Sequence, residues 1–314
     1  MKIKPLSSKG IRTYSIRKRK SKVSVADLAK IPERGGTFRD FFDSLPDILG
    51  AKDFKDVVAA IVLARKKRKT IAIGMGAHVI KTGLSPLIID LMERGVINSV
   101  SMNGAGIVHD FELAYSGSTS EDVDSELKSG AFGMAEETGC LINKAIKMGA
   151  KKGFGLGRSV GVMIEKSRYP YKRLSILAAG ARLGIPVTVH VAIGTDIVHI
   201  HPQMDGAATG KASIKDFQLF AGVVSSLEGG VYINIGSAVI MPEVFLKAIT
   251  LSRNLGYKVK NFTTVNMDFI QHYRPITNVV RRPTMGGGRG FRLTGHHEIM
   301  VPLLYAGIVE GIDG

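Results

Sequence analysis

The sequence of 314 residues contains no tryptophan and only one cysteine, Cys140. One cysteine cannot form an internal disulfide framework, and a chain without disulfides is typical of a reducing compartment, so we expect a cytoplasmic protein. No run of 18 consecutive apolar residues occurs, and the N-terminus has no apolar core followed by a small-residue cleavage site. We therefore expect a soluble chain with no membrane partner and no secretory signal.

Acidic residues are absent from the first 22 positions, which carry nine lysines and arginines. The net charge of +16 is therefore uneven along the chain. We expect a basic N-terminal arm over residues 1–35, followed by a single α/β domain over residues 36–314. Such an arm can bind phosphates, but no RNA-binding aromatic signature or zinc-finger spacing accompanies it. A solvated arm, or one that packs on a neighbouring subunit, is the favoured interpretation, and nucleic acid is not the expected partner.

The remainder of the chain has a globular composition, with 45% hydrophobic residues and 37 glycines. From residue 70 onward, short β-branched runs alternate with helical periods, which predicts a Rossmann-like, doubly wound and mainly parallel sheet with crossover helices. The expected strands are 70–74, 96–102, 186–193, 231–235 and 262–267. The segment 271–297, rich in arginine, glycine and histidine, has no clear period.

Four small-residue loops follow the expected strands: Gly74–His78, Asn103–Gly106, Gly194–Asp196 and Gly236–Ala238. Ligands of open parallel sheets bind outside the carboxyl ends of the strands, so these loops predict a nucleotide-sized ligand. None of the loops matches the G-x-G-x-x-G fingerprint, because Val79 stands where a glycine or alanine is required. An ordinary tight turn between strand and helix is the alternative interpretation of each loop.

His296, His297 and Glu298 open the last expected helix and follow the glycine-rich run Gly286–Gly288. We expect one of these histidines to move protons, and we expect Arg289 and Arg292 to bind an anionic group of a small substrate. The alternatives are polar loop residues and surface ion pairs of little energetic value.

A metal site is a weaker hypothesis. His199 and His201 alternate along an extended segment after His190 and Asp196, so these side chains could share a face. A hydrogen-bonded core histidine is the commoner explanation for His190, and we expect no metal. Nucleophilic catalysis is not expected either, because no G-x-S-x-G elbow occurs and Cys140 lies in an expected helix.

Two motifs resemble the deoxyhypusine synthase family. They are Ile73-Gly-Met-Gly-Ala-His-Val-Ile-Lys-Thr-Gly83 and Asn103-Gly-Ala-Gly-Ile-Val-His-Asp110. The resemblance continues weakly to about residue 310. It implies a Rossmann-like fold, a homotetramer, NAD as cofactor and oxidation of an amine. The residues that it places at the cofactor are Gly76, Ala77, His78, Thr82, Asn103, Gly104, Ala105, Gly106, Asp110, Gly236 and Ser237, and Asp196 would face cofactor or substrate.

The sequence departs from this family at the position of the lysine that carries the substrate fragment. The corresponding stretch reads Thr284-Met-Gly-Gly-Gly-Arg-Gly-Phe291, and no lysine follows Lys260. We therefore expect an NAD-dependent enzyme that oxidises a small amine or alcohol transiently and completes a transfer or hydrolysis on a different substrate. Two alternatives stay open: a true deoxyhypusine or homospermidine synthase that uses Lys81 or Lys211, and an NAD-binding sensor with a basic arm.

Overall fold

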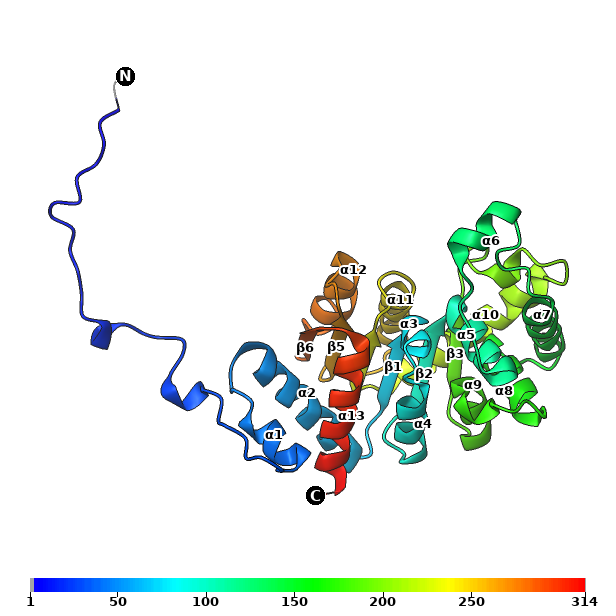
Figure 1. The fold of residues 1–314 in the computed structure, drawn as a ribbon, viewed down its shortest axis with the longest axis horizontal. Coiled ribbons are helices and arrows are strands. Elements are labelled where there is room, and N and C mark those ends of the chain that lie inside the picture. The colour runs from blue at the N-terminus through cyan, green and yellow to red at the C-terminus, as the bar shows by residue number, and fades with distance from the viewer. Residues whose placement is uncertain (1–2, 314) are drawn as a thin grey trace.

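The computed structural model describes residues 3–313, which form one six-stranded sheet with helices on both faces (Figure 1). The strand order is β3-β2-β1-β4-β5-β6, and every neighbouring pair is parallel. The strands are β1 (Ile71–Met75), β2 (Ser99–Asn103), β3 (Val187–His190), β4 (Val231–Ile235), β5 (Thr263–Asp268) and β6 (Arg289–Thr294). This confirms the expected doubly wound α/β sheet, with the strand order of a Rossmann fold.

Thirteen α-helices and five short 3₁₀ or π segments are found in the described part of the chain. The α-helices are α1 (Phe38–Ser44), α2 (Leu49–Lys66), α3 (His78–Lys81), α4 (Ser85–Glu93), α5 (Gly104–Ser116), α6 (Val123–Ser129), α7 (Glu136–Lys151), α8 (Leu156–Lys166), α9 (Ile176–Leu183), α10 (Gly206–Ser225), α11 (Ile240–Asn254), α12 (Tyr273–Pro275) and α13 (His297–Asp313). The short segments are η1 (Ile16–Lys18), η2 (Val25–Asp27), η3 (Lys172–Leu174), η4 (Ile197–His199) and the π-helical η5 (Ile276–Arg281). None of the helices within residues 3–313 has the length and apolar character needed to cross a bilayer.

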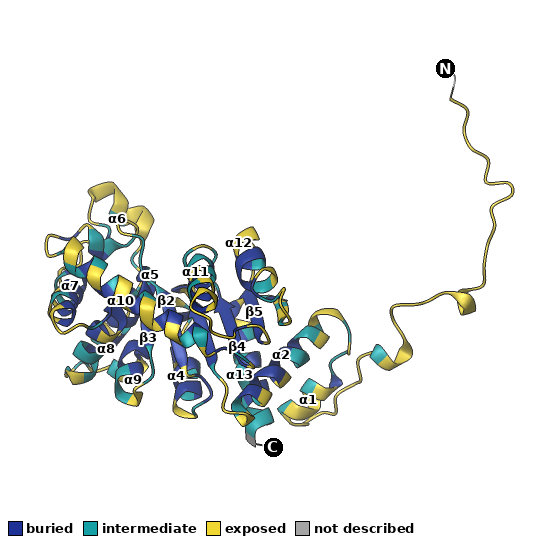
Figure 2. Cartoon of the chain, turned by 180° about the vertical axis from the view of Figure 1, so that it is seen from behind, coloured by how far each residue is buried: buried dark blue, intermediate teal, exposed yellow. Residues whose placement is uncertain are grey.

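The central strands are buried on both faces, as the near-continuous apolar composition of β1 and β4 predicts. Successive residues of a strand point to opposite faces. Ile71 and Ile73 accordingly join the core under α2, α4 and α13, whereas Ala72 joins the core under α10 and α11. Figure 2 shows this buried sheet between two helical layers.

The expectation that the strand at 262–267 is the last one was wrong, because β6 follows it within the arginine-rich segment. Its sequence, Arg-Gly-Phe-Arg-Leu-Thr, has only one buried residue, Leu293. β6 is the edge strand of the sheet, and edge strands commonly carry charged side chains on their exposed positions. The sequence of β6 therefore lacks the alternation of apolar and polar residues by which a strand is predicted.

The basic arm extends away from the domain (Figures 1 and 2). Its apolar side chains are exposed, with Leu6 at 99% and Ile31 at 95% of their full accessible area. The chain first meets the domain near Asp27, whose carbonyl accepts from the Asp47 amide at 3.0 Å, and the Lys30 amide donates to the Ser44 carbonyl at 2.9 Å. The end of the arm is thus tied to α1 by backbone hydrogen bonds.

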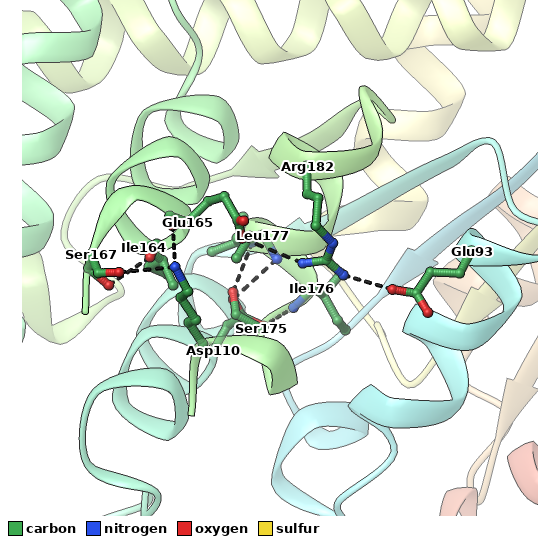
Figure 3. A network of polar contacts seen from close by, with 11 residues as sticks. Glu93, Asp110, Ile164, Glu165, Ser167, Ser175, Ile176, Leu177 and Arg182 are labelled. Carbon is green, nitrogen blue, oxygen red and sulfur yellow. Dashed lines mark hydrogen bonds and ion pairs between the residues drawn. The ribbon is translucent and has the colours of Figure 1, made fainter. Parts of the chain in front are cut away.

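Two fully buried carboxylates hold the helices beside β3. Asp216, on α10, accepts the Gly157 amide at the start of α8 and the Val189 amide of β3, both at 2.9 Å. Asp110, on α5, accepts the Ile176 and Leu177 amides at the start of α9 at 2.8 and 3.2 Å, and also the Ser175 hydroxyl (Figure 3). Each carboxylate supplies acceptors to helix N-terminal amides that lack partners inside the helix.

We predict that Asp216 makes stability depend on pH. Burial raises the pKa of Asp216 from its ordinary value of 3.8 to about 7, so the folded state holds a proton that the unfolded state has released across this range. The contribution of Asp216 to the free energy of unfolding should therefore fall, by up to about 4 kcal/mol, as pH rises from about 4 to about 7. Urea unfolding of the wild type and of Asp216→Asn, which does not titrate, measures this. A difference between the two proteins that is independent of pH would contradict the prediction.

Candidate functional site

The strand order reverses between β1 and β4, and the loops that follow these two strands touch. A Cβ atom on Gly76 would lie 2.3 Å from the Gly236 carbonyl oxygen, so only glycine permits this approach. The Gly76 amide donates to the Ile235 carbonyl at 2.9 Å, and Gly236 has φ +62°, a left-handed conformation that favours glycine. In doubly wound sheets this switch point is where ligands bind.

A cluster of rings lies over this switch point. The His297 ring, at the start of α13, is 5.4 Å from the His78 ring, measured between centroids, and 6.0 Å from the Phe269 ring. Its Cε1 atom would be only 2.7 Å from a Cβ on Gly236. His296 stacks on the outer side of Phe269 with a centroid separation of 6.1 Å. The carboxyl ends of β1, β4, β5 and β6 thus contribute to one cluster.

His297 is 1% exposed, and neither of its ring nitrogens makes a hydrogen bond of good geometry among the described residues, although the Met267 carbonyl lies near enough to favour its protonated form. Its Nε2 lies 3.8 Å from Oδ1 of the buried Asp268, which is longer than a hydrogen bond. Burial lowers the pKa of His297, and the Asp268 charge opposes this only in part. A neutral imidazole with two unsatisfied nitrogens at the switch point is able to bind a polar ligand group or to accept a proton.

A cavity of about 210 Å³ lies beside this cluster, over the carboxyl ends of β2 and β3. Its lining comes from α3, α5, the segment 120–132 and the loop before η4. The lining residues are Lys81, Ala105, Val108, His109, Glu112, Ser120, Glu121, Val123, Phe132, Thr195, Asp196 and Ile197. Helix α3 links the cavity to the ring cluster, because His78 and Lys81 lie one helical turn apart on it.

Three carboxylates and one ammonium group line the cavity, so its charge is predominantly negative. Asp196 packs against the start of α5, where a Cβ on Gly104 would lie 1.9 Å from its Oδ2 atom. Burial raises the pKa of Asp196, although His199 opposes this shift. Burial and the nearby Lys81 charge lower the pKa of His109 to about 4, so this ring is neutral near pH 7.

Most of the residues predicted at the cofactor lie at this edge of the sheet. Ala77 and Ser237 are buried beside Gly76 and Gly236, and the Ser237 hydroxyl accepts the Met241 amide at 3.2 Å. Ala105 lines the cavity, while Gly104 and Gly106 pack against Asp196 and Met102. The side chains of Asn103 and Thr82 make hydrogen bonds to the protein backbone. Asn103 caps α5 by accepting from the Gly106 amide, and the Thr82 hydroxyl donates to the His78 carbonyl.

Asp110 does not join the predicted site. Its side chain is fully buried between α5 and α9, where Ser175 and two backbone amides occupy its carboxylate oxygens (Figure 3). In this position it stabilises the start of α9. A cofactor contact from Asp110 is therefore not available in this structure.

Arg289 lies away from the site, whereas Arg292 is two residues from the ligand edge of β6. Arg289 is the first residue of β6, opposite Thr263 at the start of β5, whereas the ligand edge is at Thr294. Five residues of strand separate these two positions, which is about 17 Å. Arg289 instead lies over the Phe291 ring, 5.4 Å from its centroid, and Arg292 is exposed on the edge strand. Arg289 therefore does not contribute to the expected arginine clamp beside His296 and His297.

No group of three or more histidine, cysteine or acidic side chains within residues 3–313 is arranged to hold a metal ion. His190 is buried against Phe220, with its Nε2 3.0 Å from the Thr188 hydroxyl. His199 accepts the Gly194 and Asp196 amides through Nδ1. These histidines serve the core and the loop after β3.

Sequence reasoning missed His109, Glu112 and Glu121 as lining residues of the site. His109 and Glu112 are three residues apart on α5, a spacing that places them on one helix face and was the available signal. Glu121 comes from the segment before α6, for which periodicity gives no position. Asp268 was missed as well, although it directly follows the expected strand 262–267 and ends β5.

The chain matches no protein-family model and no curated protein sequence. It is similar to several solved structures. A protein described as LOR/SDH from Methanococcus maripaludis S2 has 16% identity and a TM-score of 0.51 over 84% of this chain and 71% of that one. A protein assigned as a deoxyhypusine synthase from Entamoeba histolytica has 11% identity and a TM-score of 0.51 over 88% and 94% of the two chains.

A mutant form of AgrE, solved as a binary complex with L-arginine, has 16% identity and a TM-score of 0.51, and the match covers 83% of this chain but 32% of AgrE. The chain thus spans about a third of the AgrE chain. At these identities the likeness concerns the fold. The chain has a deoxyhypusine-synthase-like fold. Its ligand and its reaction have to be argued from the site itself.

We predict that Gly104→Ala distorts the cavity wall, because the added Cβ would displace the Asp196 carboxylate or α5. The free energy of unfolding should fall by about 1–3 kcal/mol, as for other overpacked sites. Gly210→Ala, within α10 and with no atom inside 4 Å of the added Cβ, is the matched control and should be neutral or stabilising. Chemical denaturation of both variants measures this, and equal stabilities would show that the contact between Gly104 and Asp196 is not tight.

Proposed function

We propose that the chain is an NAD-dependent enzyme that transiently oxidises a small amine or alcohol and then completes a transfer or hydrolysis. The observation that carries the proposal is the negatively charged cavity next to the switch point of a Rossmann-ordered sheet. A dinucleotide site and a substrate site then lie on one edge of the sheet, joined by α3. The strand-end loops at Gly76–His78, Asn103–Gly106 and Gly236–Ser237 would hold the cofactor.

The residues at the switch point fit a dinucleotide. The two unpartnered nitrogens of His297 are buried polar atoms that a bound ligand would satisfy. His78 and Phe269 offer exposed rings beside it, and the Gly76 and Gly236 loops present backbone without side chains. NAD would supply hydride acceptance, which no side chain of the chain can provide.

The cavity favours a cationic or neutral substrate over an anionic one. Glu112, Glu121 and Asp196 supply three carboxylates against the single ammonium of Lys81. Since neither Arg289 nor Arg292 lines the cavity, an anion in it would meet mainly like charges, which disfavours its binding. The proposed substrate is therefore a small amine or alcohol without the anionic group that was expected to meet Arg289 and Arg292.

The side chains of the site have distinct roles in this proposal. Asp196 and Glu121 attract and orient the amine, because their carboxylates lie at the cavity wall. His297 accepts a proton at a ring nitrogen, since its lowered pKa keeps the imidazole neutral near pH 7. The buried Val108 gives the cavity an apolar wall.

Thermal unfolding with NAD tests the proposal. NAD at about 100 times its dissociation constant should stabilise the folded state by roughly 2.7 kcal/mol, a shift of a few degrees for a chain of this size. Spermidine, used as a cationic amine probe, should add to the shift. Glu121→Gln should leave the NAD shift intact and weaken the spermidine effect by about threefold or more in apparent affinity.

Glu33→Gln, which removes one negative charge from the exposed arm, is the matched control and should change neither shift. No shift with NAD would refute the cofactor assignment. A spermidine effect equal in wild type and Glu121→Gln would refute the assignment of the cavity as the amine site.

A further inference from the structure

Two side chains in the wall of the cavity, His109 and Glu112, are joined through the Thr119 hydroxyl into a hydrogen-bonded chain. The Nδ1 atom of His109 lies 2.7 Å from the Thr119 hydroxyl oxygen, and the Thr119 hydroxyl donates to Glu112 Oε2 at 2.5 Å. The Thr138 hydroxyl donates to the other carboxylate oxygen of Glu112 at 3.0 Å. Nδ1 and Oε2 are themselves 3.9 Å apart, so the Thr119 hydroxyl bridges them.

The directions of these hydrogen bonds determine where the proton of His109 lies. A hydroxyl has one hydrogen, and that of Thr119 goes to Glu112. The Thr119 oxygen must therefore accept from His109, which requires a hydrogen on Nδ1. In a neutral imidazole with Nδ1–H, the other nitrogen, Nε2, carries a lone pair and acts as an acceptor.

The Nε2 acceptor belongs to a side chain in the wall of the cavity. His109 lines the 210 Å³ cavity together with Lys81 and Asp196. Glu112 separates this cavity from a neighbouring open one of about 410 Å³, and its side chain is only 14% exposed. The loop that carries Thr119 continues through Ser120, whose φ of +76° is unusual for a residue with a side chain. A non-glycine residue keeps a positive φ only where the contacts of the surrounding structure hold it there.

The charged groups that face His109 keep the ring neutral. Burial and the Lys81 ammonium lower the pKa of His109 to about 4, so the Nε2 lone pair is present throughout the physiological range. The other ionisable groups at this cavity are Glu112, Glu121 and Asp196. All three are acceptors when ionised, and the Lys81 ammonium, the one ionisable donor in this lining, makes no hydrogen bond to His109 among the described residues.

We propose that Glu112 and Thr119 hold His109 in its Nδ1–H tautomer, and that Nε2 then selects substrates that present a hydrogen-bond donor to the cavity. The proposal rests on the proposed function, because it assigns a specificity-determining residue to the same substrate site. Glu112 and Thr119 are positioning residues that act through His109. Ammonium and hydroxyl groups satisfy Nε2, whereas a carboxylate would face a lone pair and three acids.

The tautomer is tested first without any ligand. Two-dimensional NMR of the full chain with ¹⁵N-labelled histidine distinguishes the protonated ring nitrogen, and His109→Gln identifies the His109 signals by their loss. We expect Nδ1–H in the wild type and in Thr119→Ser, which keeps the hydroxyl. Thr119→Val removes the hydroxyl at equal size, and we expect a mixture of tautomers or Nε2–H. Nε2–H in the wild type would overturn the proposal.

Selectivity is tested with three four-carbon probes: butylammonium, butanol and butyrate. Titration into the wild type with NAD present should move the His109 Nε2 signal with butylammonium and butanol but not with butyrate. Thr119→Val should weaken butylammonium binding by about tenfold, and Thr119→Ser should restore it. Butyrate binding as tightly as butylammonium, or a Thr119→Val variant that binds butylammonium as well as the wild type, would contradict the proposal.

These outcomes separate this inference from the proposed function. If the free protein shows Nδ1–H and the probes bind as expected but NAD produces no thermal shift, the NAD-dependent function fails and the specificity role of His109 stands. If NAD stabilises the protein but His109 carries its proton on Nε2, the proposed function stands and the role of His109 fails. Circular dichroism of each variant checks that the fold is retained.

Discussion

The close approach of Gly76 to Gly236 is the contact on which the candidate site depends. All six strands run parallel, so each of them ends at the same edge, but only at β1 and β4 do the following chain segments diverge to opposite sides. The missing side chains let the two loops meet, and the left-handed backbone of Gly236 leaves room for the His297 ring. A side chain at either position would move the loops and the ring together.

Asp110 and Asp216 provide a second constraint, at the β3 end of the sheet. Helices α8 and α9 both begin against buried carboxylates that belong to other helices, which joins segments far apart in the sequence. Burying a carboxyl group without hydrogen-bond partners is costly, and here each accepts two or more hydrogen bonds, although burial still raises the pKa of both groups. These contacts hold α5, which lines the cavity, and α10, without contributing to the cavity surface. They also explain why an acidic residue next to a glycine-rich motif need not be a ligand-binding residue.

The core strands and the strand-end loops were predictable from the sequence because periodicity reports burial. The apolar runs at 70–74 and 231–235 coincide with β1 and β4, and the small-residue loops lie where ligands of such sheets bind. β6 was not predictable in this way, because its exposed arginines leave no alternation of apolar and polar residues in its sequence. The misplacement of Arg289 follows from the same cause: without the strand, its distance from His296 could not be judged.

The side chains of the cavity show a different limit of sequence reasoning. His109 and Glu112 share a helix face, which a helical spacing reveals, but Thr119 reaches them from a loop with no periodicity. The charge of the cavity depends on which acids line it, and the sequence alone does not identify them. Local motifs thus predicted which edge of the sheet holds the site, whereas the side chains that line the cavity there depend on tertiary contacts.

Hydrogen–deuterium exchange of the full chain with and without NAD tests the central claim most directly, because it reports where a ligand binds. The account predicts added protection in residues 76–82, 103–106 and 236–239, with no change in residues 286–292. Protection confined to residues 286–292, or no protection at the strand-end loops at saturating NAD, would contradict it.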